Sequence, residues 1–332
     1  MSKNKIRVVV SGAGGDVAQG TIKSLLSCAL PIEIHPLNYD SNSAYMYMFP
    51  HGMISPEVSS PTYLDFLESY FVEKKIDVFI PTIDSEMELI ANNVERLSQA
   101  ARTHIFVNSR FSTLICQDKW STYKYLVDNG FSSPRTWLGS SFSGQSEITF
   151  PVIVKPRKGS GSRDITIVHG ESDLPRKCLD ENHIVQEFLS EEMDELTCGV
   201  YTGVDHEVKG IAVFRRELKN GATVFAERIL NSFIEDYVWR LASLLGTQYL
   251  NVQGKFDGKN FHIFELNGRL SGTTFMVSRV FNAPELFIRE NVLGETVARA
   301  SNPDLFIAMR TLEEFFISKS EYDQVILRIN NR

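Results

Sequence analysis

The chain has 332 residues, which suits two or three lobes because a single hydrophobic core stops growing at about 250 to 300 residues. Hydrophobic residues make up 43% and charged residues 23%, as in an ordinary globular protein and unlike a disordered one. The net charge of −7 argues against a general nucleic-acid surface, so any phosphate site must be local.

Cysteine spacing and hydropathy indicate the compartment. Cys28, Cys116, Cys178 and Cys198 lie far apart without CxxC spacing, so we expect neither a zinc site nor a disulfide framework. The N-terminal residues lack the apolar region of a signal peptide, and no run approaches the roughly 18 apolar residues of a membrane span. We therefore expect a cytoplasmic protein with reduced thiols and without a membrane or nucleic-acid partner.

The chain opens with an alternation of strand and helix. A β-branched run at Ile6–Ser11 breaks into a glycine turn at residues 12–15, and a helical pattern then leads to a second strand at Ile32–Asn38. This order predicts a βαβ unit of the doubly wound type. An NAD-binding fingerprint is the alternative, but only Gly12 and Gly14 fit it, because its third glycine would fall at Val17.

The alternation continues to about residue 108. Two more strands and two more helices are expected, at Val78–Pro81, Ile105–Asn108, Tyr63–Glu73 and Ser85–Leu97. The turn after Pro81 follows the carboxyl end of a strand, where open α/β sheets bind ligands. There Thr82 or Asp84 is expected as a helix N-cap, with a ligand role as the alternative.

A helix opens at Asp118-Lys119-Trp120 and stops at Asn129-Gly130, before an extended connection from Pro134. Phe150–Pro156 then reads as a buried strand that contains one lysine, Lys155. Lysines are seldom buried without a partner, and a polyphosphate would supply one. The donor-rich loop that follows, in which small residues let backbone N–H groups approach phosphate, consists of Lys158, Gly159, Ser160, Gly161, Ser162 and Arg163.

The next strand, Ile184–Leu189, runs into an acidic segment that ends near Glu195. Antiparallel strands at Val208–Phe214 and Thr223–Ala226 follow, with Arg215, Arg216 and Lys219 between them. These three basic residues could face phosphate or an acidic substrate, or they could form a solvated hairpin end. A helix at Phe233–Leu245 stops at Gly246.

A hairpin completes the pattern: Leu250–Phe256 and Phe261–Asn267 are β-rich runs around the turn at residues 257–260. A period of two puts Glu265 and Asn267 on one face with Ile263, opposite His262, Phe264 and Leu266. A three-residue loop would place Gln253 directly across from Glu265, and a two-residue loop would leave them diagonal.

One carboxylate and two amide oxygens, from Glu265, Asn267 and Gln253, suit Mg²⁺, which is held by a few protein oxygens together with nucleotide phosphates. Arg269, just after them, would then face phosphate. A sheet whose solvent face is merely polar is the alternative for this stretch. The hydroxyl residues Ser271, Thr273 and Thr274 are candidates for contacting an acyl substrate.

These stretches resemble the ATP-grasp superfamily. Asn251-Val252-Gln253 followed by Glu265-Leu266-Asn267-Gly268-Arg269 is similar to the N-x-Q…E-x-N-P-R signature of carbamoyl-phosphate synthase large-chain domains. Gly268 replaces the family's usual proline, which is a backbone feature and not a ligand, so the departure concerns loop rigidity.

The resemblance implies further roles. Lys119 would face phosphate at the entrance of the nucleotide domain, and Lys155 with the loop 158–163 would be the strand lysine and the flap over the phosphates. Glu187, Phe188 and Leu189 would form the hinge that reads adenine. Glu195 would take the ribose hydroxyls, with Glu192 as the alternative because the connection before it is long.

The fold class that the resemblance implies is α/β and α+β, an ATP-grasp fold. A Rossmann-like pre-ATP-grasp domain would cover residues 1–112, a small lobe with the glycine-rich flap residues 113–185, and a large lobe with the metal site residues 186–332. The cofactors would be ATP and Mg²⁺, with Mn²⁺ as a substitute.

The implied activity is that of an ADP-forming ligase that joins a small-molecule carboxylate to an amine through an acylphosphate, with Lys155 and Arg269 as catalytic residues. Carboxyphosphate and carbamate chemistry like that of carbamoyl-phosphate synthase, and a non-catalytic ATP-binding protein, are the alternatives. A homodimer is left open, and the sequence does not identify the acceptor.

Overall fold

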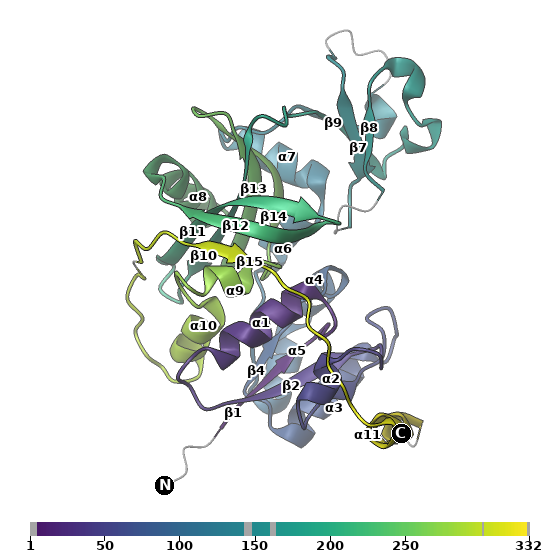
Figure 1. The fold of residues 1–332 in the computed structure, drawn as a ribbon, viewed down its shortest axis with the longest axis vertical. Helices are drawn as coiled ribbons and strands as arrows, with labels where there is room; N and C mark the ends of the chain where they lie inside the picture. The colour runs from purple at the N-terminus through teal and green to yellow at the C-terminus, as the bar shows by residue number, and fades with distance from the viewer. Residues whose placement is uncertain (1–4, 143–147, 160–163, 301, 331–332) are drawn as a thin grey trace.

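The computed structural model describes residues 5–142, 148–159, 164–300 and 302–330, and it arranges them around three β-sheets. Figure 1 shows the sheets following one another along the long axis of the molecule, with the six-stranded sheet between the other two. Within these residues no helix combines the length and the apolar character that a membrane span requires.

The first sheet is parallel and five-stranded, in the order β3-β2-β1-β4-β5. Its strands are β1 (Ile6–Val10), β2 (Ile32–Asn38), β3 (Met53–Ile54), β4 (Val78–Ile80) and β5 (His104–Ile105). Its helices are α1 (Asp16–Leu26), α2 (Tyr45–Met48), α3 (Tyr63–Lys74), α4 (Asp84–Ala91) and α5 (Val94–Ala101). This order is that of a doubly wound sheet, in which ligands bind beyond the carboxyl ends of the strands.

The single helix expected over Ser85–Leu97 is in fact two helices. Asn92 and Asn93 separate α4 from α5, and the Asn93 side chain donates to the carbonyl of Leu89 over 2.8 Å. Asparagine interrupts helices in this way because its amide competes with the backbone for hydrogen bonds.

The expected N-cap, Thr82 or Asp84, is also wrong. The cap residue is Ile83, and the fully buried carboxylate of Glu86 accepts from the backbone N–H groups of Thr82 and Ile83 over 2.8 and 2.9 Å. Glu86 also accepts from the hydroxyls of Tyr63, over 2.6 Å, and Ser11. One carboxylate from the first turn of α4 therefore fixes the loop after β4.

The second sheet is antiparallel and four-stranded, in the order β6-β9-β7-β8. Its strands are β6 (Thr136–Leu138), β7 (Val152–Pro156), β8 (Thr166–Val168) and β9 (His183–Glu187). Helices α6 (Arg110–Gln117) and α7 (Lys119–Asp128) precede it; the sequence interpretation missed α6. Short 3-10 helices occupy Gly139–Ser141, Glu171–Asp173 and Arg176–Cys178.

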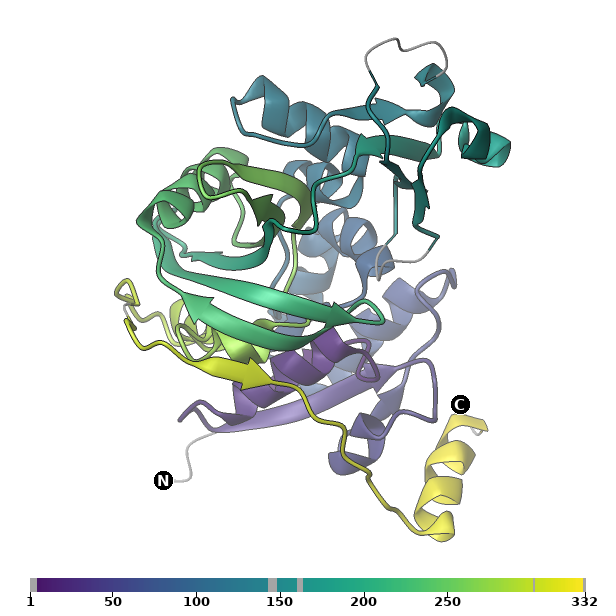
Figure 2. The same cartoon turned by 45° about the horizontal axis from the view of Figure 1, so that its top comes forward.

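The third sheet has six strands, in the order β14-β13-β10-β11-β12-β15, and every neighbouring pair is antiparallel. Its strands are β10 (Asp194–Thr202), β11 (Val208–Lys219), β12 (Ala222–Ile229), β13 (Tyr249–Phe256), β14 (Phe261–Asn267) and β15 (Ile307–Met309). The last helices are α8 (Ser232–Leu245), α9 (Thr274–Val277), α10 (Ala283–Asn291) and α11 (Lys319–Asn330). Figure 2 shows α11 beside the first sheet's end of the molecule, where Tyr322 stacks on Tyr47 with ring centroids 5.7 Å apart.

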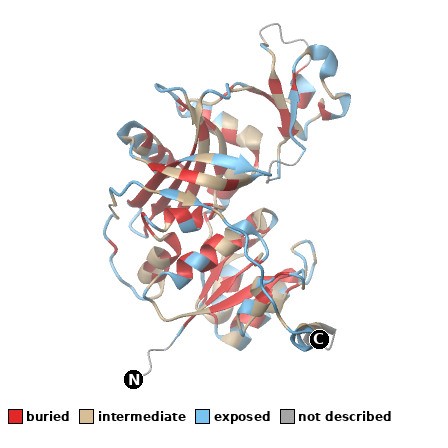
Figure 3. Cartoon of the chain, viewed as in Figure 1, coloured by how far each residue is buried: buried red, intermediate tan, exposed pale blue. Residues whose placement is uncertain are grey.

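The first and third sheets share one hydrophobic core. Phe106, after β5, stacks on Phe287 of α10 at a centroid distance of 4.6 Å and meets Tyr201 and Tyr249 edge-on. Buried residues therefore run from one sheet to the other, while the small sheet has a smaller core of its own (Figure 3). The domain boundaries at residues 112 and 185 stay a prediction.

Replacement of Glu86 tests the loop after β4. Glu86→Ala should lower the free energy of unfolding by at least about 3 kcal/mol, because each buried donor left without an acceptor costs about 1–3 kcal/mol. Glu95→Ala, an exposed glutamate in the first turn of α5, should cost less than about 1 kcal/mol. Urea unfolding measures both, and equal losses would contradict this role of Glu86.

Candidate active site

A cavity of about 870 Å³ lies where the second and third sheets meet α4 and α7. Most of the predicted site residues that the structure describes line it: Lys119, Lys155, Lys158, Gly159, Glu187, Phe188, Leu189, Glu195, Gln253, Glu265 and Asn267. Of the remaining predicted residues, Ser160, Gly161, Ser162 and Arg163 lie outside the described residues. Arg269 is described but does not line the cavity.

The hairpin β13–β14 brings the oxygen ligands together. Gln253 pairs directly with Glu265, and Asn251 with Asn267. Neither expected loop length is right, because Phe256 pairs with Phe261 and leaves four residues in the turn. A β-bulge after Gln253 supplies the extra residue that restores the predicted pairing.

Because of the same bulge, the side-chain directions predicted for β14 are partly wrong. Ile263 is fully buried in the core with Leu266, instead of sharing the face of Glu265. Phe264, predicted on the opposite face, lines the cavity beside Glu265. The strict alternation fails here because the extra residue reverses the side-chain direction on one side of the bulge.

The donor set fits magnesium in its chemistry, since a carboxylate and amide oxygens are hard ligands. Glu265 and Asn267 both line the cavity. Gln253 already has partners: its Oε1 accepts from Arg216 over 2.8 Å, and its Nε2 donates to buried Asn251 over 3.0 Å. Gln253 would therefore have to exchange Arg216 for a metal ion, and its role as a ligand stays a prediction.

Lys155 lies in the wall of the cavity and is only 6% exposed. Its Nζ donates to the Gln186 side chain over 2.9 Å, and Gln186 in turn donates to Thr136 over 2.8 Å. Burial lowers the pKa of Lys155 to about 8, although Glu265 attracts the charge. The sequence interpretation missed Gln186, whose signal was a polar residue directly after the apolar pair Ile184-Val185 in β9.

Lys119 begins α7 and points toward the same space. Its Nζ donates to the carbonyl of Gly159 over 2.8 Å, and burial lowers its pKa, again opposed by Glu265. Asp118 caps the helix and also binds Arg157, after β7, with Nε to Oδ1 at 3.1 Å. Two lysines whose ammonium groups are partly desolvated therefore meet in one cavity, as an anion site requires.

The predicted hinge lies at the end of β9. Phe188 and Leu189 line the cavity with Glu187, whose carboxylate accepts from the backbone N–H of Arg135 over 3.1 Å. Lys255 donates to the Leu189 carbonyl over 3.4 Å and so ties the segment to β13. The hinge thus forms an apolar wall with its backbone held on both sides.

The structure locates the acidic and basic residues whose roles the sequence left open. Glu195 lines the cavity and Glu192 does not. The Glu195 Oε1 accepts from Arg216 over 2.8 and 3.0 Å. Arg216 points into the cavity while its neighbour Arg215 is exposed and binds Asp194 and Glu227, because successive side chains of β11 alternate in direction. Lys219 is exposed beyond the cavity.

Arg269 lies outside the cavity wall. Its guanidinium makes a bidentate pair with Asp84 of α4 at 2.5 and 2.6 Å and donates to the Leu270 carbonyl. The pair joins the third sheet to the start of α4, at the carboxyl end of the first sheet. A phosphate contact of Arg269 stays a prediction.

The hydroxyls expected to meet an acyl substrate are buried and bind within their own turn: Ser271 to Thr273, and Thr274 to the Ser271 carbonyl. They shape the turn before α9. Their contact with an acyl substrate stays a prediction.

Comparison with known proteins agrees with this arrangement. Residues 116–200 match the family model described as an ATP-grasp domain. An uncharacterised protein of Mycoplasma genitalium is 32% identical over 112 residues, which are 32% of this chain and 38% of that protein. The arginine-specific carbamoyl phosphate synthase large chain of Bacillus subtilis is 24% identical over 233 residues, 64% of this chain and 22% of that one.

Among solved structures, N5-carboxyaminoimidazole synthetase from Staphylococcus aureus, complexed with ADP, superimposes with a TM-score of 0.72. The match covers 100% of this chain and 88% of that one at 14% identity, which shows a shared fold. The chain spans under two fifths of the Mycoplasma protein and about a fifth of the Bacillus chain.

The buried charge of Lys155 yields a prediction with a definite sign. Because its folded pKa of about 8 lies below the ordinary 10.5, the unfolded chain binds the proton more tightly, and stability rises as the pH goes from 8 to 10.5. At pH 7 the charge costs roughly 3 kcal/mol. Nucleotide-free Lys155→Met should therefore be as stable as the wild type at pH 7, or more so, and should lose that advantage by pH 10.5.

Urea unfolding at both pH values and calorimetric titration with MgATP provide the measurements. Other titrating groups are common to both proteins and cancel in the difference. ATP affinity should fall at least about tenfold, since a phosphate contact to a charged donor is worth roughly 1.5–3 kcal/mol. Exposed Lys219→Met is the control and should change neither quantity. Normal ATP binding by Lys155→Met would remove Lys155 from the phosphate site.

Proposed function

The chain has an ATP-grasp fold, and from this fold and its cavity we propose that the protein is an ATP-dependent carboxylate–amine ligase. The observation that carries the proposal is that Lys119, Lys155 and Glu265 converge in one cavity beside an apolar wall. A carboxylate substrate takes the γ-phosphoryl group of ATP, and an amine then displaces phosphate from the acylphosphate. The products are an amide-type bond, ADP and phosphate.

The side chains of the cavity supply positioning and electrostatic stabilisation. The two lysines are desolvated donors, so they stabilise charge on phosphoryl oxygens more strongly than exposed lysines would. Phe188 and Leu189 would offer the base an apolar wall, and Glu195, which lines the same cavity, would take the ribose hydroxyls. The nucleotide would thus be held at both ends, with its phosphates beside Lys155.

Glu265 and Asn267, with Gln253 once it leaves Arg216, would hold the divalent cation, Mg²⁺ or Mn²⁺, that neutralises phosphate charge when bound. Glu265 lies close enough to Lys119 and Lys155 to oppose the effect of burial on their pKa values. The cation would therefore be held beside the two lysines. A carboxylate facing two ammonium groups suits a site that must balance a polyphosphate and a cation.

A covalent protein nucleophile is not part of this proposal. Cys116 lines the cavity, but burial raises the pKa of its thiol to about 12, so it stays protonated at neutral pH and is a weak nucleophile. Direct phosphoryl transfer to the substrate is the simpler chemistry. All four cysteines are free, as the proposed cytoplasmic location requires.

Carboxyphosphate and carbamate chemistry is the second candidate, and the similarity to a carbamoyl phosphate synthase chain favours it. In that case the carboxylate would be bicarbonate and the amine ammonia. A screen for ADP release against paired carboxylates and amines, with bicarbonate and ammonia as one pair, distinguishes the two. Turnover with bicarbonate alone would favour the second candidate.

The nucleotide preference should be adenine. Calorimetry in Mg²⁺ should show ATP binding at least about tenfold more tightly than GTP, a difference of about 1.4 kcal/mol. Phe188→Ala should weaken ATP binding by a similar factor, because burying an aromatic ring contributes about 1.5–3 kcal/mol. Equal affinity for ATP and GTP would contradict the hinge assignment.

Glu265 separates a ligase from a binding protein. Glu265→Gln keeps the shape but removes the charge, so we expect ATP binding to persist while carboxylate-dependent ADP release falls by about 10² to 10³. Glu207→Gln, an exposed glutamate before β11, is the control. An equally active Glu265→Gln would remove the metal assignment, and a wild type that binds MgATP but turns over no carboxylate would favour the binding protein.

A further inference from the structure

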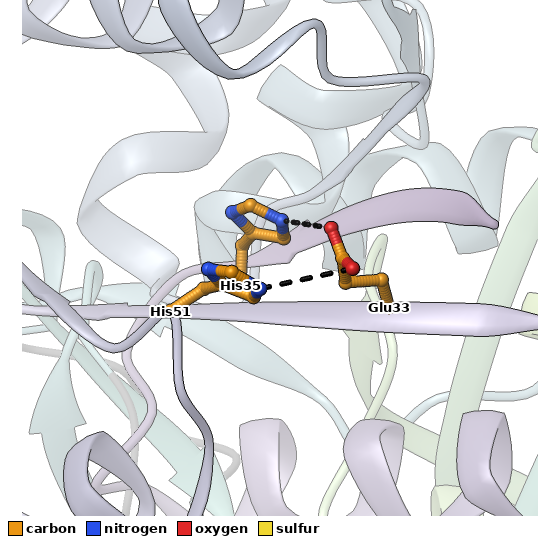
Figure 4. A group of neighbouring side chains, drawn as sticks. All are labelled: Glu33, His35 and His51. Carbon is orange, nitrogen blue, oxygen red and sulfur yellow. Dashed lines mark hydrogen bonds and ion pairs between the residues drawn. The ribbon is translucent and has the colours of Figure 1, made fainter.

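A second cluster of metal-ligand side chains lies far from the cavity. Among the residues that the structure describes, Glu33, His35 and His51 form a group whose ligand atoms all lie within 4.8 Å of one another (Figure 4). Glu33 and His35 are the second and fourth of the seven residues of β2, and none of the three cluster residues lines the cavity, which lies beyond the carboxyl ends of the first sheet's strands. The cluster therefore plays no part in the nucleotide site described above.

The local structure explains why these side chains meet. Glu33 and His35 are two residues apart on β2, so they point to the same face of the sheet. His51 comes from the turn between α2 and β3, and β3 pairs with the far end of β2. Figure 4 shows the two imidazoles reaching the Glu33 carboxylate from the same side.

The distances match a coordination shell. His35 Nε2 lies 3.2 Å from Glu33 Oε1, and His51 Nε2 lies 3.7 Å from Glu33 Oε2. Tetrahedral zinc with bonds of about 2.0 to 2.2 Å separates its ligand atoms by roughly 3.3 to 3.6 Å. The ligand atoms are thus near the required separation, and the His51 side chain, which is 40% exposed, would turn from its stacked position so that both imidazoles meet one ion.

A tyrosine orients the buried imidazole for this purpose. Tyr70 on α3 donates to the carbonyl of His51 over 3.4 Å, and its oxygen lies 3.0 Å from His35 Nδ1, from which it accepts when Nδ1 carries the proton. Without a metal ion, Nε2–H of His35 donates to the Glu33 carboxylate over 3.2 Å. A metal ion would take the place of that proton, and Nδ1–H would then donate to Tyr70, as in metal sites where a second hydrogen bond fixes the ligand ring. His35 is 2% exposed, so its ring is held in place, and His51 stacks on it at a centroid distance of 4.5 Å.

We propose that Glu33, His35 and His51 bind one divalent transition-metal ion, of which Zn²⁺ is the representative, with water completing the shell. Two imidazoles and one carboxylate are a donor set of zinc sites and differ from the all-oxygen set that suits Mg²⁺. The ion would fasten the segment between β2 and β3 to β2. This proposal is independent of the ligase activity.

The side chains of Lys5 and Arg7 both form ion pairs with Glu33 and would compete with the metal ion. Lys5 Nζ lies 3.5 Å and Arg7 Nε 3.4 Å from the oxygens of Glu33. Both distances exceed the roughly 2.7 to 2.9 Å of a strong charge-assisted hydrogen bond, and both side chains are substantially exposed. They can therefore turn to solvent when the carboxylate takes a metal ion.

The fastened segment touches the glycine turn of the first sheet. Ser43 donates to the carbonyl of Ala13 over 3.1 Å, and a Cβ at Gly14 would lie 2.9 Å from Asn38 Nδ2 and 3.3 Å from Ser43 Oγ. Metal binding would thus restrict the motion of the glycine turn at residues 12–15, which lies at the carboxyl edge of the first sheet. It should also raise the melting temperature.

The test uses the full chain freed of metal with a chelator and kept without nucleotide. Titration with Co²⁺ should give the visible absorption of a low-coordinate cobalt site at one equivalent per chain, and Zn²⁺ should displace it. Competition with a chromophoric zinc chelator measures affinity. His51→Gln should weaken Zn²⁺ binding at least about 100-fold. Tyr70→Phe removes the hydroxyl that contacts His35 Nδ1 and the His51 carbonyl and should weaken Zn²⁺ binding by about tenfold.

Arg7→Gln should strengthen Zn²⁺ binding, because it removes a competing positive charge. His262→Gln is the matched control: it replaces a histidine 3.2 Å from the carboxylate of Asp257 and should leave zinc affinity unchanged. Glu265→Gln should also leave it unchanged, which separates this site from the cavity. Because the His51 side chain is 40% exposed, its variant should unfold like the wild type when metal is absent.

Wild-type zinc affinity in His51→Gln, or the absence of a stoichiometric cobalt spectrum in the wild type, would overturn the proposal. The cluster would then be a network of ion pairs around Glu33. Loss of cobalt binding in Glu265→Gln with retention in His51→Gln would also overturn it, since the ion would then lie in the cavity.

Discussion

The buried ammonium of Lys155 is the constraint on which the candidate site depends. An apolar strand holds it where water is largely excluded, and one amide, from Gln186, is its hydrogen-bond partner. Burial favours the neutral lysine while Glu265 favours the charged one, so the pKa falls to about 8 and the group stays mostly charged at pH 7. Such a balance costs stability in the empty protein and is relieved by an anion. It is the pattern expected of a functional group more than of a structural one.

The position of that cavity depends in turn on how the sheets are joined. The core around Phe106 and Phe287 fuses the first and third sheets, and the Arg269–Asp84 pair crosses the same junction nearer the cavity. Glu86 fixes the turn that carries Asp84. The carboxyl edge of the parallel sheet is thereby held against the face of β14 on which a metal site is predicted, although the two are nearly two hundred residues apart in the chain. Arg269, conspicuous in the sequence beside the oxygen ligands, serves this junction in the structure.

The two candidate metal sites differ in chemistry and in place. Glu265 and Asn267 offer oxygen ligands beside two lysines, an arrangement for a hydrated cation that arrives with phosphate. Glu33, His35 and His51 offer nitrogen and oxygen at the other end of the first sheet, with a tyrosine behind one imidazole. The first arrangement suits a cation that comes and goes with its nucleotide. The second suits an ion that stays with the protein.

By itself the sequence determined the strands and helices that have strong periodicity. It also identified the polar residues that interrupt apolar strands. The βαβ opening, Lys155 in its strand, the hairpin with Gln253, Glu265 and Asn267, and the helix that opens at Asp118 could all be predicted, because each depends on neighbours in the chain. The fold class was implied by the resemblance of these motifs to the ATP-grasp superfamily. Predictions from local periodicity were wrong at two places. Asn92 and Asn93 divide a helix that was expected to be continuous. The bulge after Gln253 places Phe264 in the cavity and Ile263 in the core. Only the tertiary structure decided that Gln186 supports Lys155, that Arg216 and not Arg215 enters the cavity, that Arg269 binds Asp84, and that His51 joins Glu33 and His35. The physical reason is that these contacts join side chains from different elements, whose distances are set by packing between sheets and not by spacing along the chain.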